Sequence, residues 1–152
     1  MKKLLFLVVI SLSVAILSWG FIEKEPEDCS FNTIKADSLI YQKWILIKLN
    51  GKDDVKEKAG EKLPYLKFKL KEVSGYNGCN WANGDALITE DEITFSNMTI
   101  TKMACGISSF SLYEQEIEDL FFYKKPFKYK IETGILTIYK KEKEVMVLEI
   151  AN

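Results

Sequence analysis

Short apolar runs, most of them alternating with polar residues, follow one another along the chain from residue 44 onward. Alternation with a period of two is typical of a strand that has one buried and one solvent-facing side. Turn residues such as Asn50-Gly51 and Thr133-Gly134 separate the runs. The pattern predicts strands at 44–49, 65–70, 85–89, 92–95, 127–132, 135–139 and 145–150, and a short β-like segment at 98–101.

One segment has helical periodicity instead. From Ser111 onward, apolar residues recur three or four positions apart, at Tyr113, Ile117, Leu120 and Phe121. We expect Ser111 and Glu114 to form a capping box at the start of this helix, and Pro126 marks a point beyond its end.

The order of these elements indicates the fold class. Short, evenly spaced strands with one helix predict an α+β, mainly β, fold: an antiparallel sheet curled into a small barrel, with the helix packed on it or at one end. The charged stretch 52–62 is expected to be a surface loop with at most one helical turn.

The first 22 residues follow a different pattern. Lys2 and Lys3 precede an uncharged run from Leu4 to Ile22, which is typical of a secretory signal peptide. The run is also long enough to span a bilayer, so an uncleaved N-terminal membrane anchor is the alternative. Either one would export the remainder of the chain, to the periplasm or to the envelope face of a membrane. Residues 23–40 are expected to be a polar tether and residues 41–152 the folded domain.

Composition excludes several classes of function. The chain has 152 residues, with 22 acidic and 21 basic side chains, so it carries no excess of positive charge for binding nucleic acid. It contains no histidine, which excludes a Ser-His-Asp triad, a Cys-His dyad and zinc sites that need imidazole. We therefore expect no enzyme activity, no catalytic residue, no cofactor and no metal. A carboxylate pair such as Asp85 and Glu114 is the remaining hydrolytic alternative, although nothing in the sequence brings the two together.

Three cysteines leave one thiol over after any single pairing. Cys79 and Cys105 lie in segments expected to be ordered, whereas Cys29 lies in the tether, so a Cys79–Cys105 disulfide is the expected pairing. The alternative is that both are unpaired and buried. Cys29 follows Pro26-Glu27-Asp28, which argues against a lipidated cysteine.

Each of these two cysteines belongs to a short motif that we expect to be a turn rather than a strand or helix. In Ser74-Gly75-Tyr76-Asn77-Gly78-Cys79-Asn80, and at Asn83 and Gly84, glycine and asparagine suit positive φ or close backbone approach. Tyr76 and Trp81 flank Cys79 and are candidate binding-surface aromatics; the alternative is that they cap the barrel core.

The two motifs, in this order and context, resemble those of the META domain (HslJ-like) family. The resemblance rests on an opening Trp44-Ile45-Leu46, on Gly78-Cys79-Asn80, on Thr101-Lys102-Met103-Ala104-Cys105 and on a following helix with an early Glu114. Trp81 is a departure, because the family often has Arg at that position.

The resemblance implies a small β-barrel domain of the bacterial envelope, in a family linked to heat shock, motility or drug tolerance and similar in fold to pilot proteins that escort secretins. It supplies no catalytic residues. The sequence therefore predicts an exported, non-catalytic, stress-related binding, chaperone or assembly factor. Its partner would be an envelope protein or a lipid, with membrane contact possible through the N-terminal segment. The alternative is a carrier that holds a small apolar ligand or lipid within the barrel.

Overall fold

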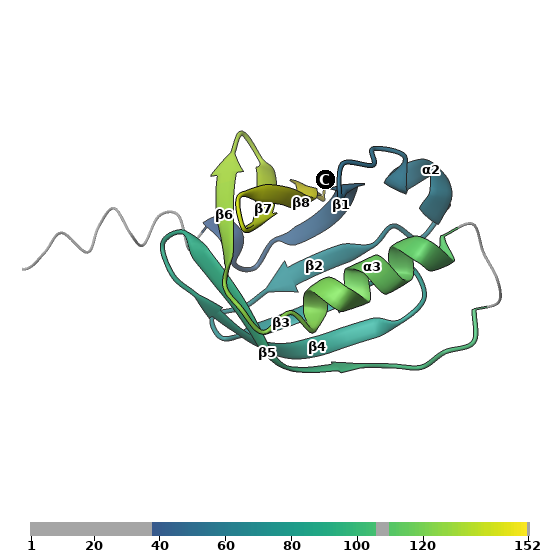
Figure 1. The fold of residues 1–152 in the computed structure, drawn as a ribbon, viewed down its shortest axis with the longest axis horizontal. Helices are drawn as coiled ribbons and strands as arrows, with labels where there is room; N and C mark the ends of the chain where they lie inside the picture. Colours follow the sequence, from purple (N-terminus) through teal and green to yellow (C-terminus); the bar gives the residue numbers. More distant parts are fainter. Residues whose placement is uncertain (1–37, 106–109, 152) are drawn as a thin grey trace, which may run out of the picture.

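Eight strands, each antiparallel to the next, close into a barrel because β8 also pairs with β1 (Figure 1). The computed structural model describes residues 38–105 and 110–151. The strands are β1 (Lys43–Leu49), β2 (Tyr65–Phe68), β3 (Glu72–Tyr76), β4 (Trp81–Ile88), β5 (Glu92–Ile100), β6 (Phe127–Glu132), β7 (Ile135–Lys140) and β8 (Lys143–Ile150). The two helices are α2 (Val55–Ala59) and α3 (Ser111–Phe121). The expected α+β, mainly β, barrel is confirmed.

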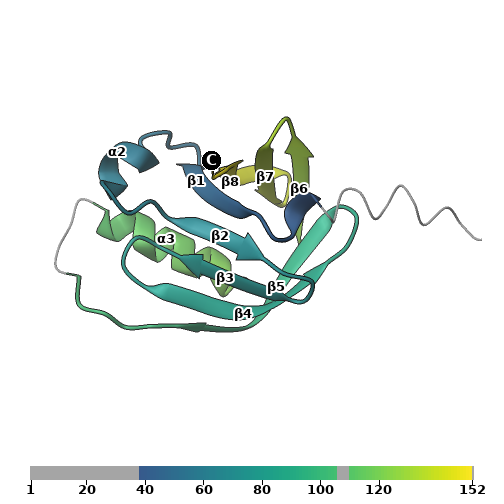
Figure 2. The same cartoon turned by 180° about the vertical axis from the view of Figure 1, so that it is seen from behind.

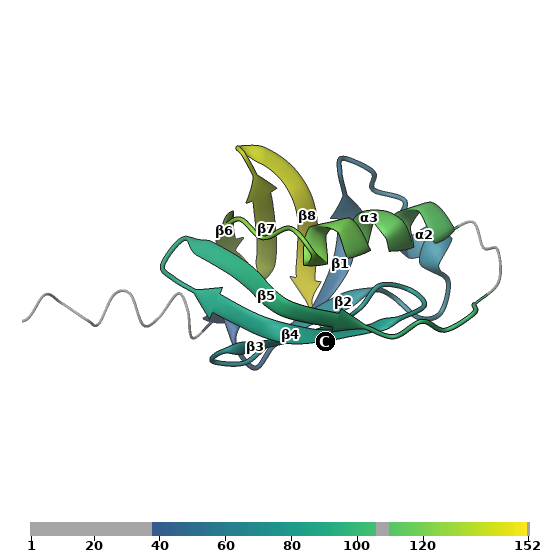
Figure 3. The ribbon, with the colours of Figure 1, turned by 60° about the horizontal axis from the view of Figure 1, so that its bottom comes forward.

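The barrel is weakest where β5 meets β6. These strands pair only through Glu92 with Lys128 and Ile93 with Phe127, and then diverge. The helix α3 connects the same two strands in sequence and lies across the opening between them (Figure 3). In Figure 1 it lies in front of β2, β3 and β4, and Figure 2 shows the opposite face of these strands.

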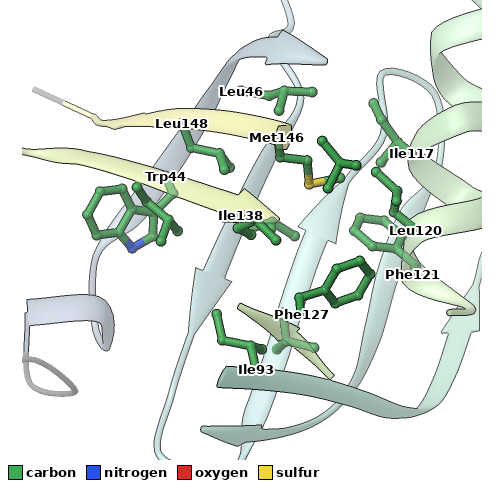
Figure 4. Packing of buried hydrophobic residues seen from close by; sticks show 14 of the residues in the cluster. Trp44, Leu46, Ile93, Ile117, Leu120, Phe121, Phe127, Ile138, Met146 and Leu148 are labelled. Carbon is green, nitrogen blue, oxygen red and sulfur yellow. The ribbon is translucent and has the colours of Figure 1, made fainter. Parts of the chain in front are cut away.

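The core lies between the strands and the buried face of α3 (Figure 4). Trp44 on β1 is fully buried, and its indole N–H donates a hydrogen bond of 2.9 Å to the carbonyl oxygen of Leu39. The rings of Phe121 on α3 and Phe95 on β5 meet edge to face at 6.4 Å. Burying a side chain of this size stabilises the fold by about 1.5–3 kcal/mol, so packing rather than pairing holds α3 in the opening.

The short helix α2 fills the segment expected to be a loop, and it matches the single turn allowed there. Its one buried side chain, Val55, fixes it to the domain. The residue before it, Asp54, accepts a hydrogen bond from the hydroxyl of Tyr113 on α3, and this bond raises the pKa of Tyr113 to about 12. The two helices are therefore linked.

Two local expectations are wrong. The N-cap of α3 is Phe110, with no side-chain cap hydrogen bond, so Ser111 is the first residue of the helix and not the N-cap that a capping box requires. The helix start is fixed instead by packing, because the Phe110 ring stacks on Tyr113 at 5.0 Å.

The glycine-rich motif was expected to be a turn throughout, but Ser74, Gly75 and Tyr76 belong to β3, and only residues 77–80 form the turn before β4. Gly75 lies inside β3 and Gly84 inside β4, and neither has a positive φ. A Cβ on Gly75 would lie 3.0 Å from the carbonyl oxygen of Tyr65 and 3.1 Å from the Phe121 ring. Gly75 is therefore required by close packing against α3 rather than by backbone conformation.

Candidate binding groove beside the disulfide-linked loop

A disulfide joins Cys79, in the turn between β3 and β4, to Cys105, which follows β5. Their Cα atoms are 5.9 Å apart, within the usual range for a disulfide. The expected pairing is thus present in the structure, and Cys29 lies outside the described residues.

Asparagine side chains hold the same turn. Asn77 is 1% exposed, and its Oδ1 accepts hydrogen bonds from the backbone N–H groups of Cys79 (3.0 Å) and Asn80 (2.6 Å). The Oδ1 of Asn80 accepts in turn from the N–H of Met103 (2.7 Å) and the hydroxyl of Thr101 (3.1 Å). Neither asparagine has a positive φ, so both are there for their amide groups. The two motifs are therefore bound together by hydrogen bonds as well as by sulfur.

Gly78 is the residue of this turn that does need glycine. Its φ is +110°, and a Cβ there would lie 2.4 Å from the ring of Phe110. The backbone of the turn consequently packs directly against the residue that begins α3.

Outside the barrel, the same region carries a row of large side chains. Ile45, Tyr65, Tyr76 and Trp81 are neighbours in register across β1, β2, β3 and β4. They alternate with inward residues such as Leu46 and Leu66, so all four belong to the outer face. Trp81 is not part of the buried core, whereas Tyr76 is buried and also lines the apolar space beside Ile117 and Phe121.

The rings in this row pack on one another. Tyr76 is 7% exposed because Tyr65 and Trp81 flank it, with ring centroids 6.3 and 4.9 Å away. Burial raises the pKa of Tyr76, and the nearby Glu114 carboxylate adds to the effect. Trp81, by contrast, remains 42% exposed. Of the two predicted aromatics, Tyr76 supports the site and Trp81 faces the solvent.

A groove of ≈ 310 Å³ runs along this row, and we call it the Trp81 groove. Its lining residues are Lys43, Ile45, Glu61, Lys62, Leu63, Tyr65, Tyr76 and Trp81. The ammonium of Lys43 lies 4.3 Å from the centroid of the Tyr65 ring, a cation–π contact that keeps a positive charge beside the aromatic rings.

The structure offers little support for chemistry at the other candidates. Among residues 38–105 and 110–151, no group of three or more His, Cys, Asp or Glu side chains could hold a metal ion. Asp85 and Glu114 line two different pockets, and the Asp85 carboxylate accepts a hydrogen bond of 2.6 Å from Asn97. The hydrolytic alternative therefore gains no geometric support.

The apolar space under α3 is small. The apolar space between α3 and the strands, lined by Leu46, Leu66, Ile117, Phe121, Met146 and Leu148 among others, measures ≈ 10 Å³. A single water needs about 10–15 Å³, so this space is too small for an apolar ligand. The volume does not favour the carrier alternative.

A closed eight-stranded barrel, crossed by one helix and locked by a disulfide between its β3–β4 turn and the segment after β5, defines the class of protein. The family model of the META domain matches residues 37–151, and the chain belongs to the META domain family. No curated protein matches it.

Two solved structures share the fold. One NMR structure is 20% identical, with a TM-score of 0.59, over 74% of this chain and 92% of the other. An NMR structure of a protein from Burkholderia xenovorans is 15% identical, also with a TM-score of 0.59, over 80% of this chain and 89% of the other. At these identities the similarity concerns the fold alone. In the described part of the chain, no helix is long and apolar enough to cross a membrane.

Sequence reasoning missed the other half of the groove. Lys43 from β1, Tyr65 from β2 and Lys62 from the segment between α2 and β2 line it together with Trp81. Strand alternation could have placed Tyr65 on the same outer side as Lys67, but the register that sets it beside Tyr76 depends on long-range pairing.

Proposed function

We propose that this META-domain protein is exported and acts in the bacterial cell envelope, without catalysing a reaction, as a stress-related binding, chaperone or assembly factor. The observation that carries the proposal is the Cys79–Cys105 disulfide. Disulfides persist in oxidising compartments and are rare in the cytosol.

One feature of the sequence supports export, and another supports a non-catalytic role. Lys2 and Lys3, followed by the apolar run to Ile22, suit a signal peptide or anchor. The absence of histidine agrees with a binding rather than a catalytic role, since few proton-transfer groups remain near neutral pH. The two motifs around Cys79 and Cys105 are explained by the disulfide and by Asn77 and Asn80, which hold a turn rather than a reacting group.

The test combines location with thiol chemistry. The full-length protein would be expressed in a bacterial host, the cells fractionated, and thiols alkylated before and after reduction. We expect the protein in the envelope fraction, with Cys79 and Cys105 alkylated only after reduction. A Lys2→Glu/Lys3→Glu variant is the matched control, and it should reduce export. A cytosolic protein with both cysteines alkylated before reduction would contradict the proposal.

A further inference from the structure

We propose that the Trp81 groove binds an anionic oligosaccharide, with a sugar ring stacked on Trp81 and its carboxylate held by Lys43 and Lys62. The proposal gives the binding role a place in the fold. Ligand binding is tested on the purified protein, whereas export is tested in cells. Either proposal can therefore fail while the other stands.

The Trp81 ring is held in place before any ligand arrives. Its backbone N–H donates to the hydroxyl of Thr101 (3.0 Å), and its carbonyl accepts from the Thr101 N–H (2.9 Å). Tyr76 supports the ring at 4.9 Å, and Tyr65 meets it edge to face at 6.1 Å. Because little side-chain freedom is left to lose, stacking on this ring costs little conformational entropy.

The charge beside this ring is positive and not neutralised. In the described residues no carboxylate oxygen lies within 4 Å of the Nζ of Lys43 or Lys62, whereas Lys48, Lys52, Lys56 and Lys69 all have such partners. Glu61 is the one acid that lines the Trp81 groove, so its lining carries two positive charges and one negative, a net of +1.

A lysine on the neighbouring strand lies next to Lys43. Lys43 on β1 lies directly opposite Lys67 on β2, and like charges placed opposite each other in a sheet destabilise it. An anion bound in the groove next to Lys43 would offset that repulsion. The arrangement is therefore complementary to a ligand that has both a ring with an apolar C–H face and a negative charge.

Size and surroundings favour a short sugar chain over other anions. The volume of ≈ 310 Å³ is at the lower end of small-ligand sites, which measure about 300–1,000 Å³. A membrane surface would be met by protruding apolar residues, but the other exposed large apolar side chains, including Tyr41, Leu87 and Phe122, do not line this groove. A net charge of +1 is small for the repeated phosphates of a nucleic acid.

Calorimetric titration of the purified full-length protein tests the proposal. The probe is a tetrasaccharide of alternating N-acetylglucosamine and glucuronate, and the comparator is the neutral N-acetylglucosamine tetramer. We expect the anionic probe to bind at least tenfold more tightly, and its Kd to rise with salt because the lysine contribution is screened.

Four variants separate stacking and charge from loss of folding. Trp81→Ala should raise the Kd about tenfold or more, and Trp81→Phe should retain most of the affinity because a ring remains. Lys62→Gln should weaken binding several-fold and reduce its salt dependence. Tyr41→Ala removes an exposed aromatic outside the groove and should leave the Kd unchanged.

Several results would overturn the proposal. These are equal binding of the neutral tetramer, no effect of Trp81→Ala, or no binding of the anionic probe at millimolar concentration. Tighter binding of dT8, of an oligoglutamate peptide or of anionic lipid vesicles would assign the groove to that ligand instead.

Discussion

Two hollows on the outside of this barrel contain similar residues but differ in how their charges are paired. The Trp81 groove measures ≈ 310 Å³ and the second hollow, which we call the β6–β7 hollow, ≈ 360 Å³. The β6–β7 hollow is lined by Asp91, Lys128, Tyr129, Lys130, Tyr139 and Glu142. Each hollow thus combines two lysines with aromatic rings.

In the β6–β7 hollow the chain satisfies its own charges. Lys128 pairs with Glu142 at 3.2 Å and Lys130 with Glu132 at 2.7 Å, and the pairing raises the pKa of both lysines. The hydroxyl of Tyr129 donates to the carbonyl oxygen of Thr89. The comparison teaches that residue composition does not distinguish a binding groove from a solvated surface. The Trp81 groove is distinguished by an exposed aromatic ring that is supported by its neighbours and lies beside lysines with no carboxylate partner among the described residues.

The largest expected effect comes from removing the disulfide. The Cys79→Ser/Cys105→Ser variant should lose about 3.5 kcal/mol of unfolding free energy, because the loop between the two residues is no longer closed in the unfolded chain. Thermal unfolding would measure this as a fall in Tm of about 10–15 °C. Hydrogen exchange should show protection lost at Tyr76 and Trp81 more than at Tyr129. An equal loss of amide protection at Tyr76, Trp81 and Tyr129 would contradict the distinction between the two hollows.

Alanine substitutions at two glycines with positive φ compare the turn beside Cys79 with the β6–β7 turn. Gly78→Ala should destabilise the protein by about 2–3 kcal/mol, because φ is +110° and the new Cβ would collide with the Phe110 ring. Gly134→Ala, in the β6–β7 turn, has φ +79° but meets its nearest atom only at 3.8 Å, so about 1 kcal/mol is expected. Denaturant unfolding would measure both, and equal costs would contradict the role given to Phe110.

Two acids on α3 should respond to pH in opposite directions. Burial raises the pKa of Glu114, which lies against the Gly78 turn. Burial also opposes ionisation of Glu116, but hydrogen bonds from Lys52 and Asn50 outweigh it and lower the pKa of Glu116. Because the pKa of Glu114 is raised in the folded state, ionising Glu114 lowers the stability of the fold once the pH exceeds the unfolded-state value of about 4.3. Because the pKa of Glu116 is lowered in the folded state, ionised Glu116 stabilises the fold above about pH 4.3. This stability is lost as the pH falls through the folded-state pKa of Glu116.

We therefore expect opposite effects at pH 7. Glu116→Gln should destabilise by up to about 1 kcal/mol, and Glu114→Gln should be neutral or slightly stabilising. Both differences from the parent protein should shrink below pH 4. Unfolding curves at pH 7 and pH 3.5 would check this, and a destabilising Glu114→Gln would refute the assignment for Glu114.

The smallest expected effect concerns the repulsion between Lys43 and Lys67. Lys67→Gln should stabilise the protein by about 0.2–0.5 kcal/mol in low salt, because it relieves the repulsion from Lys43 across the sheet. The gain should vanish in 1 M salt, where charges are screened within about 3 Å. Lys128→Gln is the matched control in the β6–β7 hollow, where no gain is expected. A gain that persists in high salt would point to a cause other than charge.

Sequence alone could predict the fold but only part of the site. Alternation predicted seven of the eight strands in whole or in part, because each has one buried side, but it missed β3 in the glycine-rich motif. Helical spacing identified the buried face of α3 through Ile117, Leu120 and Phe121. Local capping rules failed at Ser111, where packing of Phe110 on Tyr113 decides the helix start.

The motif around Cys79 pointed to the disulfide and to Trp81. It could not reveal Tyr65 or Lys43, because β1 and β2 approach the motif only through the register of the closed barrel. The exposure of Trp81 and the burial of Tyr76 likewise follow from neighbours on other strands rather than from the motif.

The most direct test follows the indole N–H signals in a two-dimensional ¹⁵N–¹H spectrum during titration with the anionic tetrasaccharide. Trp44 is an internal reference, because its indole N–H is buried and bonded to Leu39. We predict that the Trp81 indole and the amides of Tyr65 and Tyr76 shift, while Trp44 and the amides of the β6–β7 hollow do not. A Trp81 signal that stays in place, or equal shifts in the β6–β7 hollow, would contradict the assignment of the Trp81 groove as the binding face.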